Sequence, residues 1–142
     1  MTLTLHAYAA RESLEPPPPV LERDRLSHDP WGRGLTVEQY LERERTLWRT
    51  PFAQAGLRAF ILCEGSQPLA SCEAYQVPVQ LGAVYDGQAQ GPQASGTGVG
   101  IASVYVAAAL RGRGHATTLL QMVHRLLQSE GAVCSYLISE VD

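Results

Sequence analysis

The sequence Val-Tyr-Val-Ala-Ala-Ala-Leu-Arg-Gly-Arg-Gly-His-Ala, residues 104–116, is the most informative stretch of the chain. It begins inside an apolar run, 99–106, whose residue types predict a strand. Behind it, apolar residues recur at helical spacing over 116–127, and Gly131 ends the predicted helix. A second β-rich run follows at 132–141. The stretch therefore forms the glycine-rich turn of a unit made of strand, turn, helix and strand.

The turn has the features of an anion-binding site. Gly112 and Gly114 stand where the backbone must bend sharply before the helix begins. Backbone N–H groups at a helix start have no partner within the helix, and the helix dipole adds partial positive charge there. A side chain at either glycine would stand between these N–H groups and a phosphate. Because Arg111 and Arg113 add full charges and Thr117 adds a hydroxyl donor, we expect a ligand that carries phosphate.

Two other interpretations of the turn are open at this point. The first is an ordinary strand-to-helix turn with solubilising Arg residues, since two glycines in a loop are a weak signal. The second is a dinucleotide-binding fold, which requires a third glycine and a turn directly after the strand. This chain has Thr117 at the third glycine position, and its turn does not follow the strand directly. The dinucleotide interpretation therefore fits less well.

The stretch resembles the acetyl-CoA motif of the GCN5-related N-acetyltransferase (GNAT) family, whose signature is Gln/Arg-x-x-Gly-x-Gly/Ala after a strand. Arg111, Gly114 and Ala116 fill the three fixed places of this motif. Ala108 stands where many members carry Pro. The resemblance is close over 99–141 and looser in the order of the earlier elements. It implies an α/β fold with a mixed sheet, of the GNAT acyltransferase type.

The resemblance implies an acetyl-CoA-dependent N-acyltransferase that transfers an acetyl group to a primary amine by direct attack on the thioester. Family members hold the pyrophosphate on the backbone N–H groups of the turn and pair the pantetheine arm with the exposed edge of the preceding strand. A backbone N–H near Val106 is the expected donor to the thioester oxygen. The implied cofactor-binding residues are Val104, Tyr105, Val106, Arg111, Gly112, Arg113, Gly114, His115, Ala116 and Thr117.

The sequence leaves several candidates for the general base that takes the amine proton. Many family members place a carboxylate on the strand that here spans 99–106, and this strand has none. We select Glu73 and Tyr105 as the catalytic candidates, with Tyr75 as a further one. A structural alternative stays open for each, since Tyr105 would pack or hydrogen-bond and Glu73 would lie on a solvated face. His124 lies on the polar side of the predicted helix and is not a candidate.

Family domains continue past the strand predicted at 132–141 with a helix and two more strands, whereas this chain stops at Asp142. We therefore expect one domain, 1–142, that lacks its last helix and strands. Its uncovered strand edge would pair with a second copy or with a separately encoded C-terminal half. A non-catalytic CoA-binding or interaction module is the alternative function. Residues 100–104 and 136–142 resemble the subgroup related to fungal lysine acetyltransferases.

Composition excludes several classes of protein. All 11 residues counted as Lys or Arg are Arg, and the chain contains no Lys and no Asn. A Walker-type phosphate loop, a Schiff-base enzyme and N-glycosylation are thereby excluded. The net charge of -3 and the pI of about 5.8 argue against nucleic-acid binding as the main function. Because the chain has neither a membrane-spanning run nor a signal-peptide pattern, we expect a cytoplasmic protein that acts on a small-molecule or peptide amine.

The rest of the chain predicts further elements of the same domain. Thr36 and Gln39 form a capping-box pattern at the start of a helix whose solvent face includes Glu44. Cys63, Cys72 and Cys134 fall in apolar strand-like segments, which predicts structural cysteines without a disulfide or a metal. The other expected segments are an edge strand at 2–9, a stiff Pro-rich connector at 15–19, an aperiodic region at 20–34, strands at 57–64 and 69–81, and a flexible Gly/Gln-rich loop at 85–98.

Overall fold

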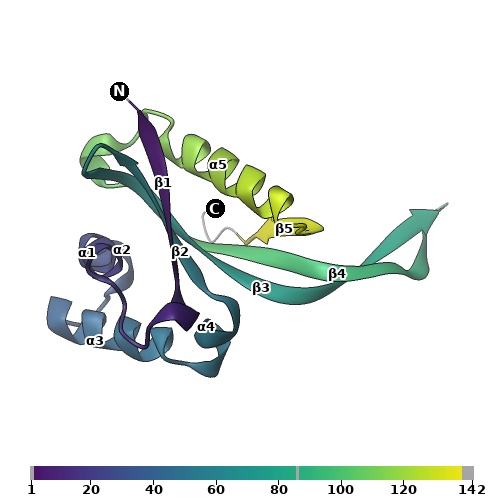
Figure 1. Ribbon diagram of the computed structural model, residues 1–142, viewed down its shortest axis with the longest axis horizontal. Coiled ribbons are helices and arrows are strands. Elements are labelled where there is room, and N and C mark those ends of the chain that lie inside the picture. Colours follow the sequence, from purple (N-terminus) through teal and green to yellow (C-terminus); the bar gives the residue numbers. More distant parts are fainter. Residues whose placement is uncertain (1, 86, 139–142) are drawn as a thin grey trace.

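The computed structural model describes residues 2–85 and 87–138, and its centre is a 5-stranded mixed sheet in the order β1-β2-β3-β4-β5 (Figure 1). The pairs from β1 to β4 are antiparallel, whereas β5 runs parallel to β4. The strands are β1 Leu3–Ala9, β2 Arg58–Glu64, β3 Gln67–Tyr85, β4 Gln88–Tyr105 and β5 Cys134–Leu137. The helices are α1 Pro18–Leu26, α2 His28–Trp31, α3 Val37–Trp48, α4 Pro51–Gly56 and α5 His115–Ser129, with short 3-10 turns η1 Ala10–Glu12 and η2 Ala108–Leu110. The predicted mixed α/β fold is confirmed.

Helices cover both faces of the sheet (Figure 1). On one face, α5 packs the apolar side chains of Leu119 and Val123 against a core that includes Phe60 of β2. On the other face lie α1 to α4, which bury Val20 and Trp48 in a second cluster. Successive strand residues point to opposite faces, so each central strand supplies both cores. A side chain on the second face of β3 or β4 therefore lies between the sheet and the helices α1 to α3.

Local sequence signals place several elements where the sequence predicts them. The capping box is confirmed, because the Gln39 N–H donates to Thr36 Oγ1 at 3.2 Å and the Thr36 N–H donates to Gln39 Oε1 at 2.9 Å. The predicted edge strand is β1, which lies at the end of the sheet. The helix predicted after the glycine-rich turn is α5, and Gly131 follows its end with φ of 88°. These signals act between residues that are close in sequence, which is why they could be read from it.

The prediction of a flexible loop at 85–98 is wrong over the residues that the structure describes, because β4 already begins at Gln88. β3 and β4 form a long hairpin that projects beyond the helices, with pairs from Val77 and Gly98 out to Tyr85 and Gln88 (Figure 1). Backbone hydrogen bonds between strands require no particular side chain. Small residues therefore suit a two-stranded ribbon that has no core to fill. Because a composition rich in Gly, Ala and Ser is also typical of loops, the sequence did not reveal this hairpin. Asp86 lies outside the described residues.

Helix α1 begins at Pro18, inside the connector predicted at 15–19, and continues into the aperiodic region at 20–34, which also contains α2. Sequence periodicity predicted neither helix, and the connector prediction is wrong for Pro18 and Pro19. Pro18 occupies the first turn of α1, where its missing N–H would have no partner in any case. The buried face of α1 joins the apolar Val20 to the charged Arg23 and Asp24. An apolar stripe was absent from the sequence because two of the three buried positions on this helix are ionic.

A β-bulge interrupts β4 at Ser103. Glu73 of β3 pairs with Ala102 and Ser71 pairs with Tyr105, so β4 has one extra residue between the two pairs. Ser103 takes a φ of 52°, a left-handed conformation that residues other than Gly rarely adopt. An extra residue reverses the alternation of side chains along a strand. Beyond the bulge, Val104 therefore packs against the α5 core while Tyr105 points to the face of α1.

Among the three cysteines, Cys72 is fully buried, Cys63 and Cys134 are partly buried, and all three are free. Burial raises the pKa of the Cys72 thiol from 9.0 to about 12. The unfolded chain therefore loses this proton above pH 9, whereas the native chain keeps it until about pH 12.

We expect the free energy of unfolding to fall across this window, with Cys72 contributing at most about 1.4 kcal/mol per pH unit. Urea unfolding at a series of pH values measures this free energy. The Cys72→Ala variant should show a shallower decline than the wild-type chain between pH 9 and 12. Equal slopes would contradict the prediction.

Candidate active site

The parallel strands β4 and β5 pair only over part of their length. Their register runs from Gly98 and Cys134 to Ile101 and Leu137, and β4 continues to Tyr105. Within the described residues, the edge of β4 beyond Ile101 that faces β5 has no strand partner. Its backbone N–H and C=O groups are therefore available to an extended ligand. The cofactor-binding positions predicted at 104–106 lie on this edge.

The glycine-rich turn leads from the end of β4 into α5. Gly112 and Gly114 have φ of 75° and 79°, and a Cβ added to either would meet no atom within 4 Å. Open space therefore lies over the start of α5, where Gly114 is the N-cap and the first backbone N–H groups have no partner within the helix. Arg111 braces the turn, because its Nε donates to the Val106 carbonyl at 3.0 Å. Arg113 is exposed beside it. The turn fits a pyrophosphate group.

A cleft of about 670 Å³ opens on the face of α1 to α3 where β4 and β5 separate. The bulged part of β4 and the end of β5 form one wall, while α1 and α3 contribute charged and aromatic side chains. We call it the acceptor cleft. Its lining includes Arg23, Trp31, Tyr40, Arg43, Glu44, Glu73, Tyr75, Ala102, Ser103, Val104 and Leu137. The cleft thus brings two carboxylates, Glu44 and Glu73, to the place where the strands part.

Glu73 holds the bulge of β4 to helix α1. Its Oε2 accepts a hydrogen bond from Ser103 Oγ at 2.9 Å, and its Oε1 accepts one from Arg23 Nη2 at 2.8 Å. Arg23 also forms an ion pair with Asp24, its neighbour on α1. Burial acts against the charge of Arg23, but the carboxylates of Glu73 and Asp24 outweigh it and raise the pKa of this guanidinium. The solvated-face alternative for Glu73 is wrong, because its side chain is 18% exposed and its carboxylate is bonded to Arg23 and Ser103.

Removing the Glu73 carboxylate should destabilise the fold. The Arg23 side chain is only 8% exposed, and one Nη atom has no hydrogen-bond partner within the described residues. We expect Glu73→Ala to lower the free energy of unfolding by about 3 kcal/mol, because the variant leaves a buried cation with one partner fewer. Urea denaturation measures the change. Glu12→Ala, at an exposed position of η1, is the control and should leave stability within about 0.5 kcal/mol.

Glu44 was predicted on the solvent face of its helix, and this prediction is wrong. Its side chain is 14% exposed and lines the acceptor cleft, where it accepts hydrogen bonds from Arg43 Nε and Nη2 at 3.0 and 2.8 Å. Burial, reinforced by the charges of Asp24 and Glu73, raises the pKa of the Glu44 carboxyl above its ordinary value of 4.5. Glu44 lies four residues after Tyr40 and thus shares its buried helix face. This spacing is the signal that could have found it.

Tyr105 and Tyr75 occupy different surroundings. Tyr105 Oη donates to the Leu26 carbonyl at the end of α1, at 2.7 Å, and its ring lies 5.9 Å from that of Trp31. This contact favours the structural alternative for Tyr105. Tyr75 lies across Gly100 of β4, where an added Cβ would come within 2.2 Å of its ring. Tyr75 therefore forms part of the floor of the acceptor cleft. His124 is exposed on α5, away from the cleft.

The family of the chain follows from comparison with known proteins. The model of the Acetyltransferase (GNAT) family matches residues 13–142. The chain belongs to the GNAT family. Membership confirms the resemblance predicted from Arg111, Gly114 and Ala116, and it makes this GNAT chain an N-acetyltransferase with acetyl-CoA as its cofactor. No curated protein matches the chain at a significant level.

Solved structures share the GNAT fold at low sequence identity. An aminoglycoside acetyltransferase from an uncultured soil metagenomic sample is 18% identical, with a TM-score of 0.60 over 100% of this chain and 82% of its own. A GNAT family acetyltransferase of Staphylococcus aureus is 10% identical, with a TM-score of 0.65 over 99% and 89%. An aminoglycoside N-acetyltransferase in complex with CoA is 16% identical, with a TM-score of 0.58 over 98% and 78%. These likenesses extend over nearly the whole of the present chain.

Two further properties concern the described residues alone. No helix in 2–85 or 87–138 is long and apolar enough to span a membrane. The same residues contain no group of His, Cys, Asp and Glu side chains that could hold a metal ion.

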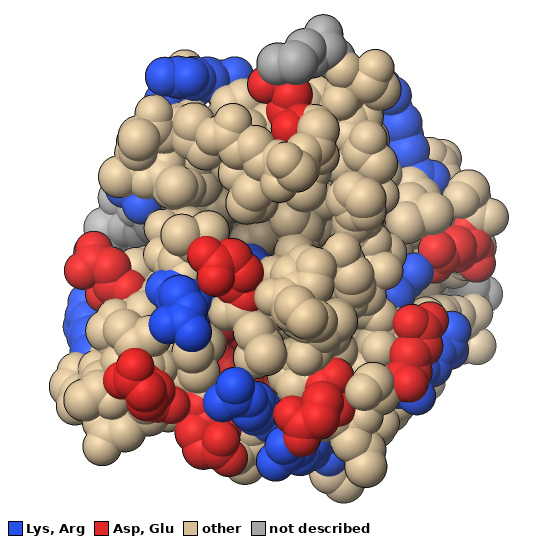
Figure 2. All heavy atoms as spheres, turned by 60° about the vertical axis from the view of Figure 1, so that its left-hand side comes forward, with Lys and Arg blue, Asp and Glu red and all other residues tan. Residues whose placement is uncertain are grey.

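Charged residues of both signs are interspersed over the helical side of the molecule (Figure 2). This face has no extended basic patch of the kind that binds nucleic acid.

Proposed function

We propose that this GNAT protein transfers the acetyl group of acetyl-CoA to a primary amine that enters the acceptor cleft. The observation that carries the proposal is the meeting of three features at the bulge of β4. These are the unpaired edge beyond Ile101, the open space above Gly112 and Gly114, and a cleft that carries the carboxylates of Glu44 and Glu73. The first two suit the cofactor, and the third suits an amine.

The cofactor positions follow from the predicted residues. The backbone N–H groups of 111–117 bind the pyrophosphate, with Arg113 as an added charge. The backbone of 104–106 pairs with the pantetheine arm and donates an N–H to the thioester oxygen near Val106. Bound acetyl-CoA supplies an activated acyl group. Ser103 and Glu73 keep the bulge that separates this edge from β5, so that Glu73 acts as a positioning residue.

Glu44 is the residue that we propose as the general base. An acceptor amine must lose a proton to attack the thioester, and a base with a pKa nearer neutrality does this best. Burial raises the pKa of Glu44 even though Arg43 donates two hydrogen bonds to it, whereas the Glu73 carboxylate is bonded through both oxygens, to Arg23 and to Ser103. Proton transfer passes from the amine to a Glu44 oxygen, directly or through one water molecule. No covalent enzyme intermediate is needed, which agrees with the absence of Lys.

The acceptor class that we propose is a small cationic amine. The aromatic side chains of Trp31 and Tyr75 line the cleft beside the two carboxylates, and aromatic rings attract ammonium groups. Aminoglycosides are acceptors of this chemical kind, and two of the similar structures described above are aminoglycoside acetyltransferases. A peptide amine is the other acceptor class that the sequence predicted.

Calorimetry and turnover test the proposal in two steps. Acetyl-CoA titrated into the purified chain should give a saturable heat. A thiol reagent should then detect release of free CoA when the chain is mixed with acetyl-CoA and a panel of polyamines, aminoglycosides and amino-terminal peptides. Binding without thiol release would favour the alternative function, a non-catalytic CoA-binding module. No saturable heat would overturn the cofactor site itself.

Assembly is a further proposal. β5 forms the edge of the sheet, and it is followed by Ile138, which is 80% exposed, next to Leu137 at 47%. Exposed apolar residues at a sheet edge support the pairing with a second copy or a separate C-terminal half that we expect from the sequence. Sedimentation of the chain at several concentrations tests for the homodimer. Cytoplasmic location and the fungal lysine acetyltransferase subgroup also stay predictions.

A further inference from the structure

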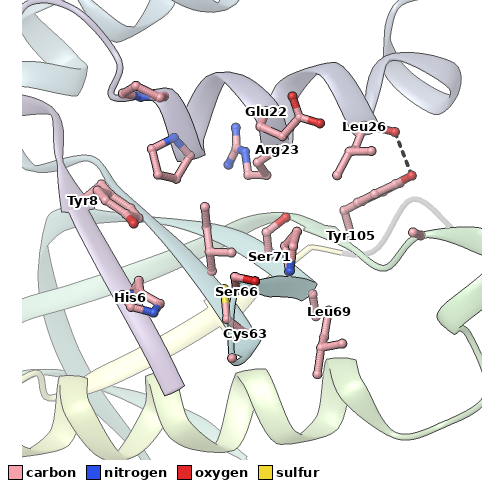
Figure 3. Close-up of a pocket in the computed structure, with 17 residues that line it drawn as sticks. His6, Tyr8, Glu22, Arg23, Leu26, Cys63, Ser66, Leu69, Ser71 and Tyr105 are labelled. Atoms are coloured by element: carbon pink, nitrogen blue, oxygen red, sulfur yellow. Dashed lines mark hydrogen bonds between the residues drawn. The ribbon is translucent and has the colours of Figure 1, made fainter. Parts of the chain in front are cut away.

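A second cavity lies beneath α1, on the same face of the sheet as the acceptor cleft but toward β1 and β2. Its volume is about 510 Å³, which is within the usual range for sites that bind small molecules. We call it the α1 cavity. Helix α1 forms its roof, and the strands β1 to β3 with the end of β4 form its floor (Figure 3). The residues that define it here are His6, Tyr8, Ile61, Leu69, Ser71 and Tyr105.

The α1 cavity is distinct from the acceptor cleft. Among the residues that the structure describes, only Arg23 borders both spaces. Its guanidinium is held by Asp24 and Glu73, and this ion-pair group separates the two spaces. The side of the molecule turned forward in Figure 2 is hollowed within mainly uncharged surface. An acceptor amine bound in the acceptor cleft would therefore leave the α1 cavity unfilled.

The walls of the α1 cavity are mainly apolar, and Ser71 brings a hydroxyl group to its floor. Ile61 and Leu69 are 3% and 5% exposed, and Pro18 and Pro19 face them from α1. Ser71 is also only 3% exposed and lines the floor of the cavity. Figure 3 shows Ser71 pointing from β3 toward α1. A hydroxyl group at this place can donate a hydrogen bond to a ligand in the cavity or accept one from it.

The charges around the α1 cavity select against anions. Glu22 stands at its exposed rim, and Arg23 is already paired with two carboxylates. An anionic ligand would therefore meet a negative rim and a guanidinium whose charge two carboxylates already balance. Flat rings at Tyr8 and Tyr105 on opposite sides of the space suit an aromatic body. We propose that the α1 cavity is a binding site for a neutral aromatic alcohol or a molecule of the same chemistry, whose hydroxyl group bonds to Ser71.

Cys63 gives a direct way to detect a ligand in the α1 cavity, because its side chain lies in the cavity wall. The probe is 2-naphthol, and the readout is the rate of alkylation by iodoacetamide, followed for each cysteine by peptide mass spectrometry. We expect about tenfold slower alkylation of Cys63 at a probe concentration ten times the Kd. Cys134 lies outside the cavity and serves as the internal control, with an unchanged rate. The readout involves neither acetyl-CoA nor turnover, so its outcome is independent of the proposed function.

Two variants complete the test. Ser71→Ala removes the hydroxyl from the floor and should weaken protection of Cys63 by about fivefold in Kd, the effect of one neutral hydrogen bond. Thr97→Ala removes an exposed hydroxyl on β4, away from the α1 cavity, and should leave the Kd unchanged. Protection of Cys63 that Ser71→Ala weakens and Thr97→Ala does not would support the site. No protection in the wild-type chain, or equal slowing at Cys63 and Cys134, would overturn it.

Discussion

Replacing Gly114 with Val should raise the Kd for acetyl-CoA about a hundredfold, which corresponds to about 3 kcal/mol. Gly114 has a φ of 79°, and no atom of the chain lies within 4 Å of the position that a Cβ would take. A valine side chain would fill this open space and cover the backbone N–H groups at the start of α5. It would also strain the left-handed backbone. Calorimetric titration with acetyl-CoA measures the change.

Gly131→Val is the matched control for this prediction. Gly131 has a φ of 88° and open space around it, but it lies at the opposite end of α5. The control therefore introduces the same side chain with a similar backbone strain, far from the predicted pyrophosphate. We expect the Gly131→Val variant to be less stable than the wild-type chain and to keep the same Kd for acetyl-CoA. If both variants weakened binding equally, the loss would come from α5 as a whole, and the turn would not be the cofactor site.

Glu44→Gln should lower turnover about 100- to 1000-fold, the usual effect of removing a general base. The variant keeps the size of the side chain and its place in the cleft but cannot take a proton from the amine. Because Glu44 lies on α3 and the cofactor is expected on β4 and α5, the Kd for acetyl-CoA should not change. Thiol release with the best acceptor of the panel measures turnover, and calorimetry measures the Kd.

The pH profile assigns the base. Turnover requires ionised Glu44, whose pKa is raised above 4.5, so the wild-type rate should fall as pH falls through this raised pKa. This acidic limb should be lost in Glu44→Gln. Glu42→Gln, on the same helix at a side chain that is 62% exposed, is the control and should keep both rate and profile. If Glu73→Gln removed the acidic limb and Glu44→Gln kept it, Glu73 would be the base.

Much of the cofactor half could be predicted from the sequence, because its features depend on neighbouring residues. A glycine with positive φ, the first turn of α5 and the strand before it are all local. The same holds for the capping box of Thr36 and Gln39. The hairpin over 88–98 could not be predicted in this way, since its strand conformation comes from pairing with β3 and its composition is typical of a loop.

The acceptor half could be predicted only in part. The selection of Glu73 and Tyr105 as catalytic candidates stays a prediction, and the structure shows each bound to a partner far along the chain. Glu73 meets Arg23 across 50 positions, and Tyr105 meets Leu26 across 79. Arg23 itself gave no signal, because its helix has no apolar stripe. Such contacts depend on how α1 lies on the sheet, which no short-range pattern records.

By itself, the sequence determined that a glycine-rich turn joins a strand to a helix and that the chain resembles the GNAT family, and it predicted a phosphate-binding site at this turn. Backbone conformation and helix polarity are local properties, so residues 104–116 were sufficient for this. Only the tertiary structure decided the rest. It turned Glu44 into the cleft, tied Glu73 to the bulge at Ser103 and placed Ser71 in the floor of the cavity beneath α1. Each of these depends on the packing of helices against a sheet, where burial and charge are set by distant residues.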